Sequence, residues 1–213
     1  MQNITDFLYS IDKSIFLFIN VTLSSPLLDP AMTRITDFKF WLIPGILGAA
    51  LYVFRENKKK ALTVLGLVAL TVALSDPLSS QVLKKIFARP RPCNPDFLVE
   101  GGRFLLGKWR SLSFPSSHSM NMFSVATIFF CFYRKYGVYF YSFAGLIAYT
   151  RVYNGMHYPA DIVGGAAVGC LLGWGVYAGF VFIKSKYFKP KADDKDQGQI
   201  SDQSQQQSQQ GQT

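Results

Sequence analysis

Long runs of apolar residues, each ended by charged groups, dominate the chain up to its polar tail. Fifteen residues without a charged side chain follow Lys13, Lys39, Lys60 and Lys135, and longer uncharged stretches cover 111–133 and 162–183. A helix rises about 1.5 Å per residue and the hydrocarbon core is about 30 Å thick, so roughly twenty residues cross it. The two longer stretches suffice alone, and flanking Lys and Arg stems extend the shorter ones to the headgroups.

This pattern predicts an all-α fold, a polytopic membrane bundle with five to six transmembrane helices. Five spans are expected, near residues 39–55, 60–84, 117–134, 137–153 and 161–183. The segment Ile4–Leu28 is interrupted by Asp12 and Lys13 and ends in Ser-Ser-Pro, which suits a helix lying in the interface at least as well as a crossing. No basic leader precedes it, so no cleavable signal is expected.

Composition favours a membrane protein over an ordinary soluble one. Hydrophobic residues make up 49% of the chain and charged residues 16%, whereas about a quarter of a typical soluble protein is charged. The three cysteines, Cys93, Cys131 and Cys170, are scattered, which argues against a disulfide framework and a structural zinc site. Residues 189–213 are rich in Gln and nearly free of apolar side chains, so this tail is expected to be disordered.

The distribution of Lys and Arg sets the expected orientation. The two sets of helix ends carry eleven and ten of these cations, so the bare count does not decide it. Short hairpins and termini report orientation best, and those at 55–60, 134–135 and 184–195 share one face. We expect that face to be cytoplasmic in a multi-pass inner-membrane protein, with the loop from Ala88 to Pro115 on the extracytoplasmic side.

Three clusters of polar and charged residues stand at helix ends on that outer face. They are Lys84–Pro92, Phe114–His118 and Thr150–Asp161, and they hold both histidines of the chain. Each has a plain explanation by itself: cations bind anionic headgroups, Pro-Ser-Ser caps a helix, and a histidine can mark a membrane boundary. Together they put four cations, two imidazoles and a carboxylate at one depth, which is costly near lipid unless they serve a site.

The residue types in these clusters favour a phosphate ligand. Lys84, Arg91 and Arg151 supply concentrated positive charge, and Arg can bind two phosphate oxygens at once. Free N–H groups at the start of the helix after Pro115 also favour an anion. Because Asp161 is the only acid beside a histidine, no metal site and no cofactor are expected, and nucleophilic catalysis is favoured over metal-activated water.

The two histidines can divide the chemistry of phosphoryl transfer between them. His157 and Asp161 are four residues apart, one helical turn, so the carboxylate can accept a proton from one ring nitrogen and leave the other bare. The bare nitrogen is then the expected nucleophile toward phosphorus. His118, on a different helix, is the expected acid for the leaving group, while the cations stabilise the charge of the transition state.

In order and spacing, these motifs resemble the three-part signature of the type 2 phosphatidic acid phosphatase superfamily. The matching segments are Lys84 to Arg91-Pro92, Pro115-Ser116-Ser117-His118, and Thr150-Arg151 to His157 to Asp161. The resemblance implies a helical bundle and a phosphohistidine intermediate on His157. It also implies that phosphate is held by Lys84, Arg91, Ser116, Ser117, His118 and Arg151. Two positions depart from the pattern, because Ser117 stands where the family usually has Gly and Thr150 replaces Ser.

Several other residues are weaker candidates for a supporting role. Asp76 is expected to face inward, with Ser80 and Lys84 following at four-residue steps, and to act as structural or electrostatic support. Arg89 and Arg110 are candidates for a second phosphate or a headgroup, with interfacial anchoring as the alternative. Trp109 is expected in an aromatic belt at the interface. Close helix packing is expected at five glycines of the last span, Gly164, Gly165, Gly169, Gly173 and Gly175.

The resemblance, the small size and the outward site favour an integral-membrane phosphatase that acts on an isoprenoid carrier diphosphate, with undecaprenyl diphosphate as first choice. Phosphatidic acid, phosphatidylglycerol phosphate and the 1-phosphate of lipid A stay open as substrates, as does transfer of the phosphate to another lipid. The expected partners are a lipid phosphate and the bilayer, and not a nucleic acid. A non-catalytic lipid-binding or transport bundle is the alternative from another class.

The expected domain organisation follows from these assignments. Residues 1–30 form an N-terminal interfacial or transmembrane helix, residues 31–188 form the transmembrane catalytic domain, and residues 189–213 form the polar tail.

Overall fold

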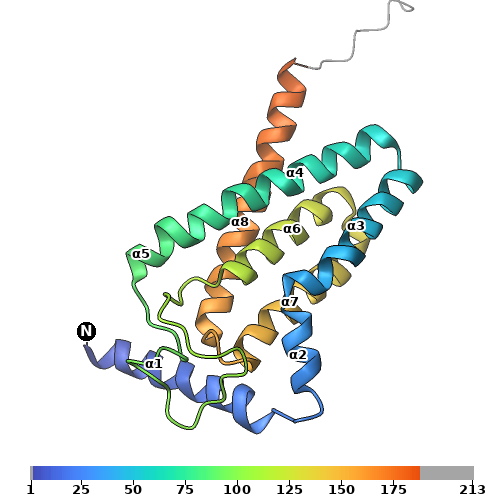
Figure 1. The fold of residues 1–213 in the computed structure, drawn as a ribbon. Coiled ribbons are helices and arrows are strands. Elements are labelled where there is room, and N and C mark those ends of the chain that lie inside the picture. The colour runs from blue at the N-terminus through green and yellow to red at the C-terminus, as the bar shows by residue number, and fades with distance from the viewer. Residues whose placement is uncertain (1, 188–213) are drawn as a thin grey trace, which may run out of the picture. The chain divides into compact units, whose positions relative to one another are not determined.

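The computed structural model describes residues 2–187, with side chains from residue 4, and its described elements are all helical (Figure 1). The tail prediction for 189–213 lies outside the described residues. The first compact unit is Met1–Ala178, and the chain from Gly179 on belongs to a second unit, described only as the last turns of a helix. The elements are α1 (Gln2–Leu17), η1 (Phe18–Thr22), α2 (Asp29–Ile35), α3 (Phe38–Arg55), α4 (Lys58–Pro77), η2 (Leu78–Leu83), α5 (Lys84–Phe87), α6 (Ser117–Phe132), η3 (Arg134–Tyr136), α7 (Gly137–Tyr153) and α8 (Pro159–Tyr187).

Three of the described helices are long and apolar enough to cross a membrane. They are Phe38–Arg55, the continuous run Lys58–Phe87 and Pro159–Tyr187. Helices α6 and α7 occupy the other two expected positions but are 16 and 17 residues long. No described residue of α3 is buried, although its composition is strongly apolar, and such a surface is stable when it faces lipid. The chain is therefore a helical membrane protein, while the number of crossings stays a prediction.

The run from α4 to α5 is one continuous helix with a wider segment inside it (Figure 1). The Asn57 side chain starts the helix by accepting hydrogen bonds from the Lys59 and Lys60 N–H groups, at 3.0 and 3.4 Å. Directly after Pro77, η2 adopts π-helical pairing, which adds a residue to each turn and rotates everything beyond it. The helix ends at Ala88, whose backbone is left-handed with φ 48°. Lys84 thus stands on the last turn, next to the long loop.

Helices α6 and α8 approach each other along a row of glycines. A Cβ added at Gly165, Gly169 or Gly173 would lie 2.4–2.6 Å from a backbone carbonyl oxygen of α6 or its N-cap residue. At Gly164 it would meet the Phe114 ring at 2.5 Å. The absence of side chains lets the two backbones come into contact, as in other membrane helix pairs. The predicted close helix packing is confirmed at Gly165, Gly169 and Gly173. Gly164 packs against a side chain of the loop instead, and Gly175 has nothing within 4 Å.

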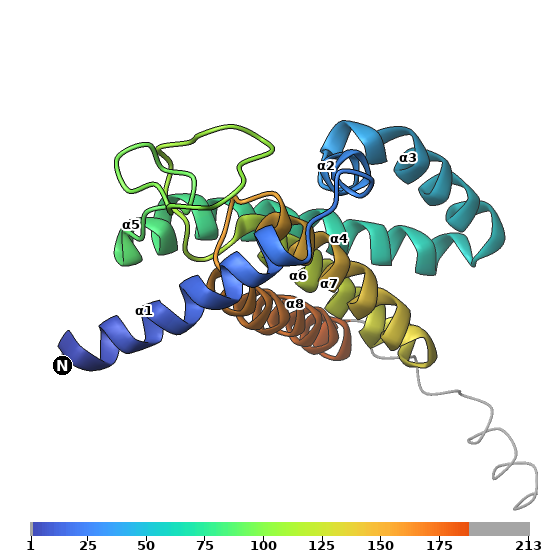
Figure 2. The ribbon, with the colours of Figure 1, turned by 90° about the horizontal axis from the view of Figure 1, so that it is seen from below.

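Helix α1 runs across the start of α8 (Figure 2) and carries its apolar side chains on the outside. Three residues at four-residue steps face inward instead: Asp12 and Phe16 of α1, and Asn20 of η1. The Asn20 amide donates to the Arg103 and Tyr153 carbonyl oxygens at 2.8 and 2.7 Å and accepts from the Arg103 N–H at 2.6 Å. This side chain ties the N-terminal segment to the long loop and to α7. Whether α1 also crosses the membrane stays a prediction.

Candidate active site

The structure brings residues of all three sequence clusters together at one end of α6 and α7. Arg91 Nη1 lies 3.2 Å from His157 Nε2, although the two residues are 66 positions apart. His118 lies within the electrostatic reach of Arg91, Arg151, His157 and Lys84. The three basic residues and two imidazoles predicted to bind one phosphate are thus neighbours, contributed by α5 and the loop after it, α6, α7 and the turn before α8.

His157 is held with one nitrogen toward Asp161 and the other toward the cations. The His157 side chain is 1% exposed and the Asp161 side chain is completely buried, and Nδ1 lies 3.5 Å from Asp161 Oδ2. Arg91 can only donate, so Nε2 accepts and carries the lone pair, which leaves the proton on Nδ1. This tautomer is the one that makes Nε2 a nucleophile.

Ser113 stands between the members of this pair and was missed in the sequence. Its hydroxyl donates to Asp161 Oδ2 and lies 3.3 Å from His157 Nδ1. The Ser113 N–H donates to the Arg89 carbonyl oxygen at 2.7 Å, which fixes this stretch of loop beside the first cluster. No sequence spacing links Ser113 to His157, 44 residues away, so only its place just before Phe114-Pro115 could have drawn attention to it.

The surroundings of His157 keep its imidazole neutral. Burial lowers the pKa of His157 to about 3, and the positive charges of Arg91 and Arg151 act in the same direction. Asp161 opposes the shift, but does not outweigh it. A neutral ring with its bare nitrogen among cations is ready to attack an anionic phosphate.

Arg91 and Arg151 have the properties of an anion-binding site. Each is more than nine-tenths buried, and the Nε group of each has no hydrogen-bond partner. Burial lowers the pKa of Arg91, since no carboxylate pairs with it directly. Arg151 Nη1 donates to Thr36 Oγ1 at 2.8 Å, a contact from the end of α2 that the sequence did not indicate. Unsatisfied buried guanidinium donors fit a phosphate in this space.

The three predicted hydroxyl groups are bonded elsewhere. Ser116 Oγ is fully buried and accepts from the Ser119 N–H at 3.4 Å as the N-cap of α6. Ser117 Oγ lies 2.8 Å from Ser79 Oγ on η2, and Thr150 Oγ1 donates to the Ile147 carbonyl oxygen of its own helix at 2.7 Å. The backbone N–H groups of Ser117 and His118, in the first turn of α6, have no intrahelical acceptor. These N–H groups, more than the hydroxyls, are what the helix offers an anion.

Two expectations about supporting charges, those for Asp76 and Arg89, need correction. Asp76 and Ser80 are exposed and Ser79 is buried instead, because the buried row of this helix passes through Thr71, Ser75 and Ser79, one position away from Asp76 and Ser80. Arg89 neither anchors at the interface nor is free for a second phosphate, because its two terminal nitrogens pair with Asp12 and Asp161. Arg110 forms an exposed pair with Asp96 at 3.4 Å.

A cavity of about 640 Å³ opens beside His118 and Arg151. Trp109, expected in an interfacial belt, lines this cavity and has its indole N–H bonded to the Leu106 carbonyl oxygen. Thr33, Arg34 and Asp37 line it from α2 and the turn that follows. His118 is exposed to the cavity, and its ring has no hydrogen-bond partner within the described part of the chain. A group attached to a phosphate at the cations would extend into this space.

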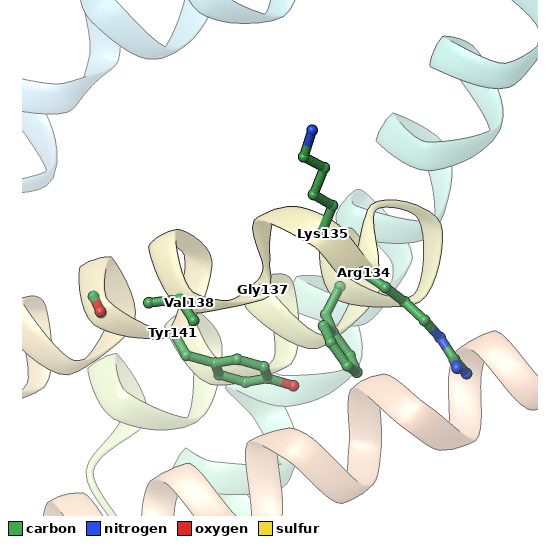
Figure 3. A pocket seen from close by; sticks show the side chains of 7 residues that line it. Arg134, Lys135, Gly137, Val138 and Tyr141 are labelled. Carbon is green, nitrogen blue, oxygen red and sulfur yellow. The ribbon is translucent and has the colours of Figure 1, made fainter.

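A second cavity, of about 580 Å³, lies at the opposite end of α6 and α7, around η3 (Figure 3). Lys135 extends away from the Tyr141 ring there. None of the predicted site residues lines this cavity. Among residues 2–187, no three His, Cys, Asp or Glu side chains are grouped so that they could hold a metal ion.

Comparison with known proteins agrees with this arrangement. Residues 60–184 match the model of the PAP2 superfamily. The chain is 33% identical to a lipid A 4′-phosphatase of Bacteroides thetaiotaomicron, over 81% of this chain and 78% of that protein. It is 30% identical to a provisionally named undecaprenyl-diphosphatase of Escherichia coli, over 77% and 81%. A transmembrane PAP2-type phosphatidylglycerolphosphate phosphatase from Bacillus subtilis has a similar structure, with TM-score 0.58 and 28% identity over 83% of this chain and 88% of that one.

These relatives act on lipid phosphates, and their matches extend over all three clusters described above. The chain belongs to the PAP2 superfamily of membrane lipid phosphatases.

Proposed function

We propose that the chain removes a phosphate from a membrane lipid by two successive displacements at His157. In the first, Nε2 attacks phosphorus while the bond to the lipid oxygen breaks. His118 becomes protonated when the negative charge of the bound phosphate lies beside it, and it gives its proton to that oxygen. In the second, neutral His118 takes a proton from water, and the water oxygen displaces His157 and releases inorganic phosphate. The observation that carries this proposal is the 3.2 Å contact from Arg91 to Nε2, which puts the lone pair of His157 on the cation side.

The cations have a separate task in the same reaction. Lys84, Arg91 and Arg151 surround the position that a phosphoryl group would take, and the two arginines have unsatisfied Nε donors. Charge that builds on the phosphoryl oxygens in the transition state is stabilised by donors already in place. Asp161 and Ser113 hold the Nδ1 side of the ring, so that the imidazolium formed on attack has a negative partner.

The first candidate substrate is lipid A carrying a 4′-phosphate, as the name of the Bacteroides relative suggests. The leaving group must lie next to His118, in the cavity lined by Thr33, Arg34, Asp37 and Trp109. Hydroxyl, guanidinium and carboxylate groups beside an indole ring match the polar edges and apolar faces of a sugar. A sugar phosphate therefore fits this cavity.

Undecaprenyl diphosphate is the second candidate. Arg34 lines the cavity without a side-chain partner within residues 4–187, and a free cation there could bind the phosphate that remains on the isoprenoid chain. The Escherichia coli relative supports the same assignment. For both candidates we propose a site on the extracytoplasmic face of the inner membrane, as the positions of the short basic hairpins predict.

The test is phosphate release by the purified full chain in detergent, with EDTA present, from lipid A, undecaprenyl diphosphate and phosphatidylglycerol phosphate. We expect phosphate release to be fastest from lipid A and to be abolished in His157→Asn. With ³²P-labelled substrate and rapid quenching, we expect an acid-labile phosphoenzyme in the wild type and none in His157→Asn. Release from none of the lipids would favour a binding or transport bundle. Loss of activity with EDTA would contradict the metal-free mechanism. Formation of a ³²P-labelled phosphoenzyme by His157→Asn would show that His157 is not the nucleophile.

Variants of the cavity distinguish the two substrates. Trp109→Ala is expected to lower kcat/KM for lipid A about tenfold, whereas Arg34→Ala lowers it mainly for undecaprenyl diphosphate. Phe97→Ala and Arg110→Ala are the matched controls, since both residues are exposed on the same loop and lie outside the cavity lining. Equal effects of the cavity and control variants would refute the placement of the leaving group.

A further inference from the structure

An inward-facing carboxylate on α1 reaches the catalytic histidine pair through one arginine. Asp12 is 7% exposed, while Phe7, Leu8, Ile11 and Ile15 around it on the same helix are exposed. A helix that shows its apolar side chains outward and buries a carboxylate does not follow the pattern of a soluble amphipathic helix. Burying that charge is costly unless it is paired, so the partners of Asp12 identify its purpose.

Both oxygens of the Asp12 carboxylate have partners next to Asp161. Oδ2 accepts from Arg89 Nη2 at 2.6 Å. Oδ1 accepts from the Ala160 N–H at 2.8 Å, a first-turn group of α8 that has no acceptor within its own helix. Asp12 thus caps α8 from another helix, at the residue that directly precedes Asp161.

Arg89 continues the connection to Asp161 itself. Its Nη1 donates to Asp161 Oδ1 at 2.8 Å, and its guanidinium lies over the Tyr158 ring, 4.1 Å from the centroid. Burial opposes the charge of Arg89, but Asp161 and Asp12 outweigh it and raise its pKa. Because Arg89 holds Oδ1, the second oxygen, Oδ2, is left for Ser113, the Tyr158 N–H and the His157 ring.

We propose that Asp12 and Arg89 are positioning residues for the His157–Asp161 pair, so that docking of α1 is part of the active site. This inference rests on the proposed function of His157 and Asp161. Asp12 fixes the position of the Arg89 guanidinium and of the first turn of α8. These two contacts in turn fix the orientation of the Asp161 carboxylate. Neither residue lines the cavity beside His118 and Arg151. Their loss therefore acts on the chemical step and leaves phosphate binding in place.

The first test replaces Asp12 by Asn in the full chain, with lipid A in detergent micelles as substrate. The carboxamide keeps an oxygen for the Ala160 N–H but loses the charge that holds Arg89. We expect kcat to fall about 10-fold to 100-fold, with KM and the inhibition constant of inorganic phosphate within about threefold of the wild-type values. Asp6→Asn is the matched control, because Asp6 is exposed on the same helix, and it should keep full activity.

A second variant and a double mutant separate positioning from loss of the fold. Asp12→Glu keeps the charge, and its kcat should be at least threefold higher than that of Asp12→Asn. Arg89→Gln should lower kcat by a similar factor, and adding Asp12→Asn to it should cost little more, since both act through one contact.

Three outcomes are decisive against the proposal or its basis. Asp12→Asn with kcat within twofold of Asp6→Asn would overturn the inference. If Asp12→Asn lost kcat and inhibition by inorganic phosphate to the same extent, and Asp12→Glu restored neither, Asp12 would have only a structural role. That result would also overturn the inference. Absence of turnover by the wild type on every lipid tested would instead remove the proposed function, and the inference with it.

Discussion

At the scale of single residues, the orientation of the reactive imidazole depends on several partners that lie far apart in the sequence. Asp161 alone leaves Nδ1 at 3.5 Å, a long contact, and Ser113 fills the space between the two groups. Ser113 can donate to the carboxylate while its oxygen accepts from the ring, so one hydroxyl serves both members of the pair. The hydroxyl thereby makes the Nδ1–H tautomer the one with satisfied hydrogen bonds.

We predict that Ser113→Ala lowers kcat about tenfold with little change in KM. The substitution removes a buried hydrogen bond to a carboxylate, which is worth roughly 1.5–3 kcal/mol, while the phosphate-binding cations stay in place. Steady-state kinetics on lipid A measures the effect. Ser111→Ala, at an exposed position of the same loop, is the control and should match the wild type. A Ser113→Ala enzyme with wild-type kcat would show that Asp161 orients the ring without help.

Residue types and spacing predicted the groups that the structure now brings together, but not how each is used. His157 and Asp161 share a local turn, so four-residue spacing was enough to pair them. Arg91, Arg151 and His118 could be grouped because each stands at a helix end on one face. Ser113, Thr36 and Asp12 could not be found in this way, since their contacts cross 44 to 148 positions of the chain and no local periodicity encodes them.

At the scale of elements, backbone contact between α6 and α8 sets the distance between Ser116 and Asp161. The Ser116 N–H donates to the Asp161 carbonyl oxygen at 3.0 Å, so the two helix starts meet directly at the site. Gly165, Gly169 and Gly173 continue this contact along α8. Without a hydrophobic driving force between helices in lipid, such close packing is what holds them together.

We predict that Gly169→Ala destabilises the protein by about 1–3 kcal/mol, because its Cβ would lie 2.4 Å from the Met120 carbonyl oxygen and must push the helices apart. Gly175→Ala is the matched control on the same helix, with nothing within 4 Å, and should be neutral or slightly stabilising through helix propensity. The midpoint of thermal unfolding in detergent measures both. Equal midpoints for the two variants would contradict the packing argument.

The apolar runs predicted where the long helices lie along the chain, but they could not predict irregular turns inside those helices. Helices α3, α4, α6, α7 and α8 all lie within or around the five expected spans, because a charge-free run of this length has few alternatives in a bilayer. The π-helical segment η2 is a different case. Pro77 could signal an irregularity but not the extra residue in the turn. Asp76 and Ser80 are exposed because the buried row of this helix passes through Thr71, Ser75 and Ser79, one position away from them.

At the scale of the whole molecule, the N-terminal segment is tied to the rest of the chain from the middle of α1 and from η1, which follows it. Tyr9 and Asp12 contact the start of α8, while Asn20, beyond the helix, binds the long loop and α7. The outer surface of α1 is apolar, and its contact with lipid stays a prediction. The buried Asp12 was taken in the sequence only as an interruption of the apolar run. Its pairing with Arg89 depends on tertiary structure, which the sequence pattern does not show.

The buried imidazole of His157 links the stability of the whole molecule to pH. Burial lowers the pKa of His157 to about 3 in the folded protein, against 6.5 for an ordinary histidine. Below pH 6.5 the unfolded chain therefore binds a proton that the folded chain does not. The stabilisation is fully present above pH 6.5 and is lost as the pH falls from 6.5 toward 3, by at most roughly 1.4 kcal/mol per pH unit.

We predict that the thermal midpoint in detergent falls less between pH 7.5 and pH 4.5 for His157→Asn than for the wild type. The Asn side chain cannot take up the proton, so the variant loses the contribution of this one group and keeps those of the carboxylates and of His118. Scans at several pH values on both proteins give the difference in slope. Identical slopes would mean that His157 is protonated in the folded state at pH 4.5. A charged ring at that pH would contradict the lowering of its pKa by burial and by the surrounding arginines.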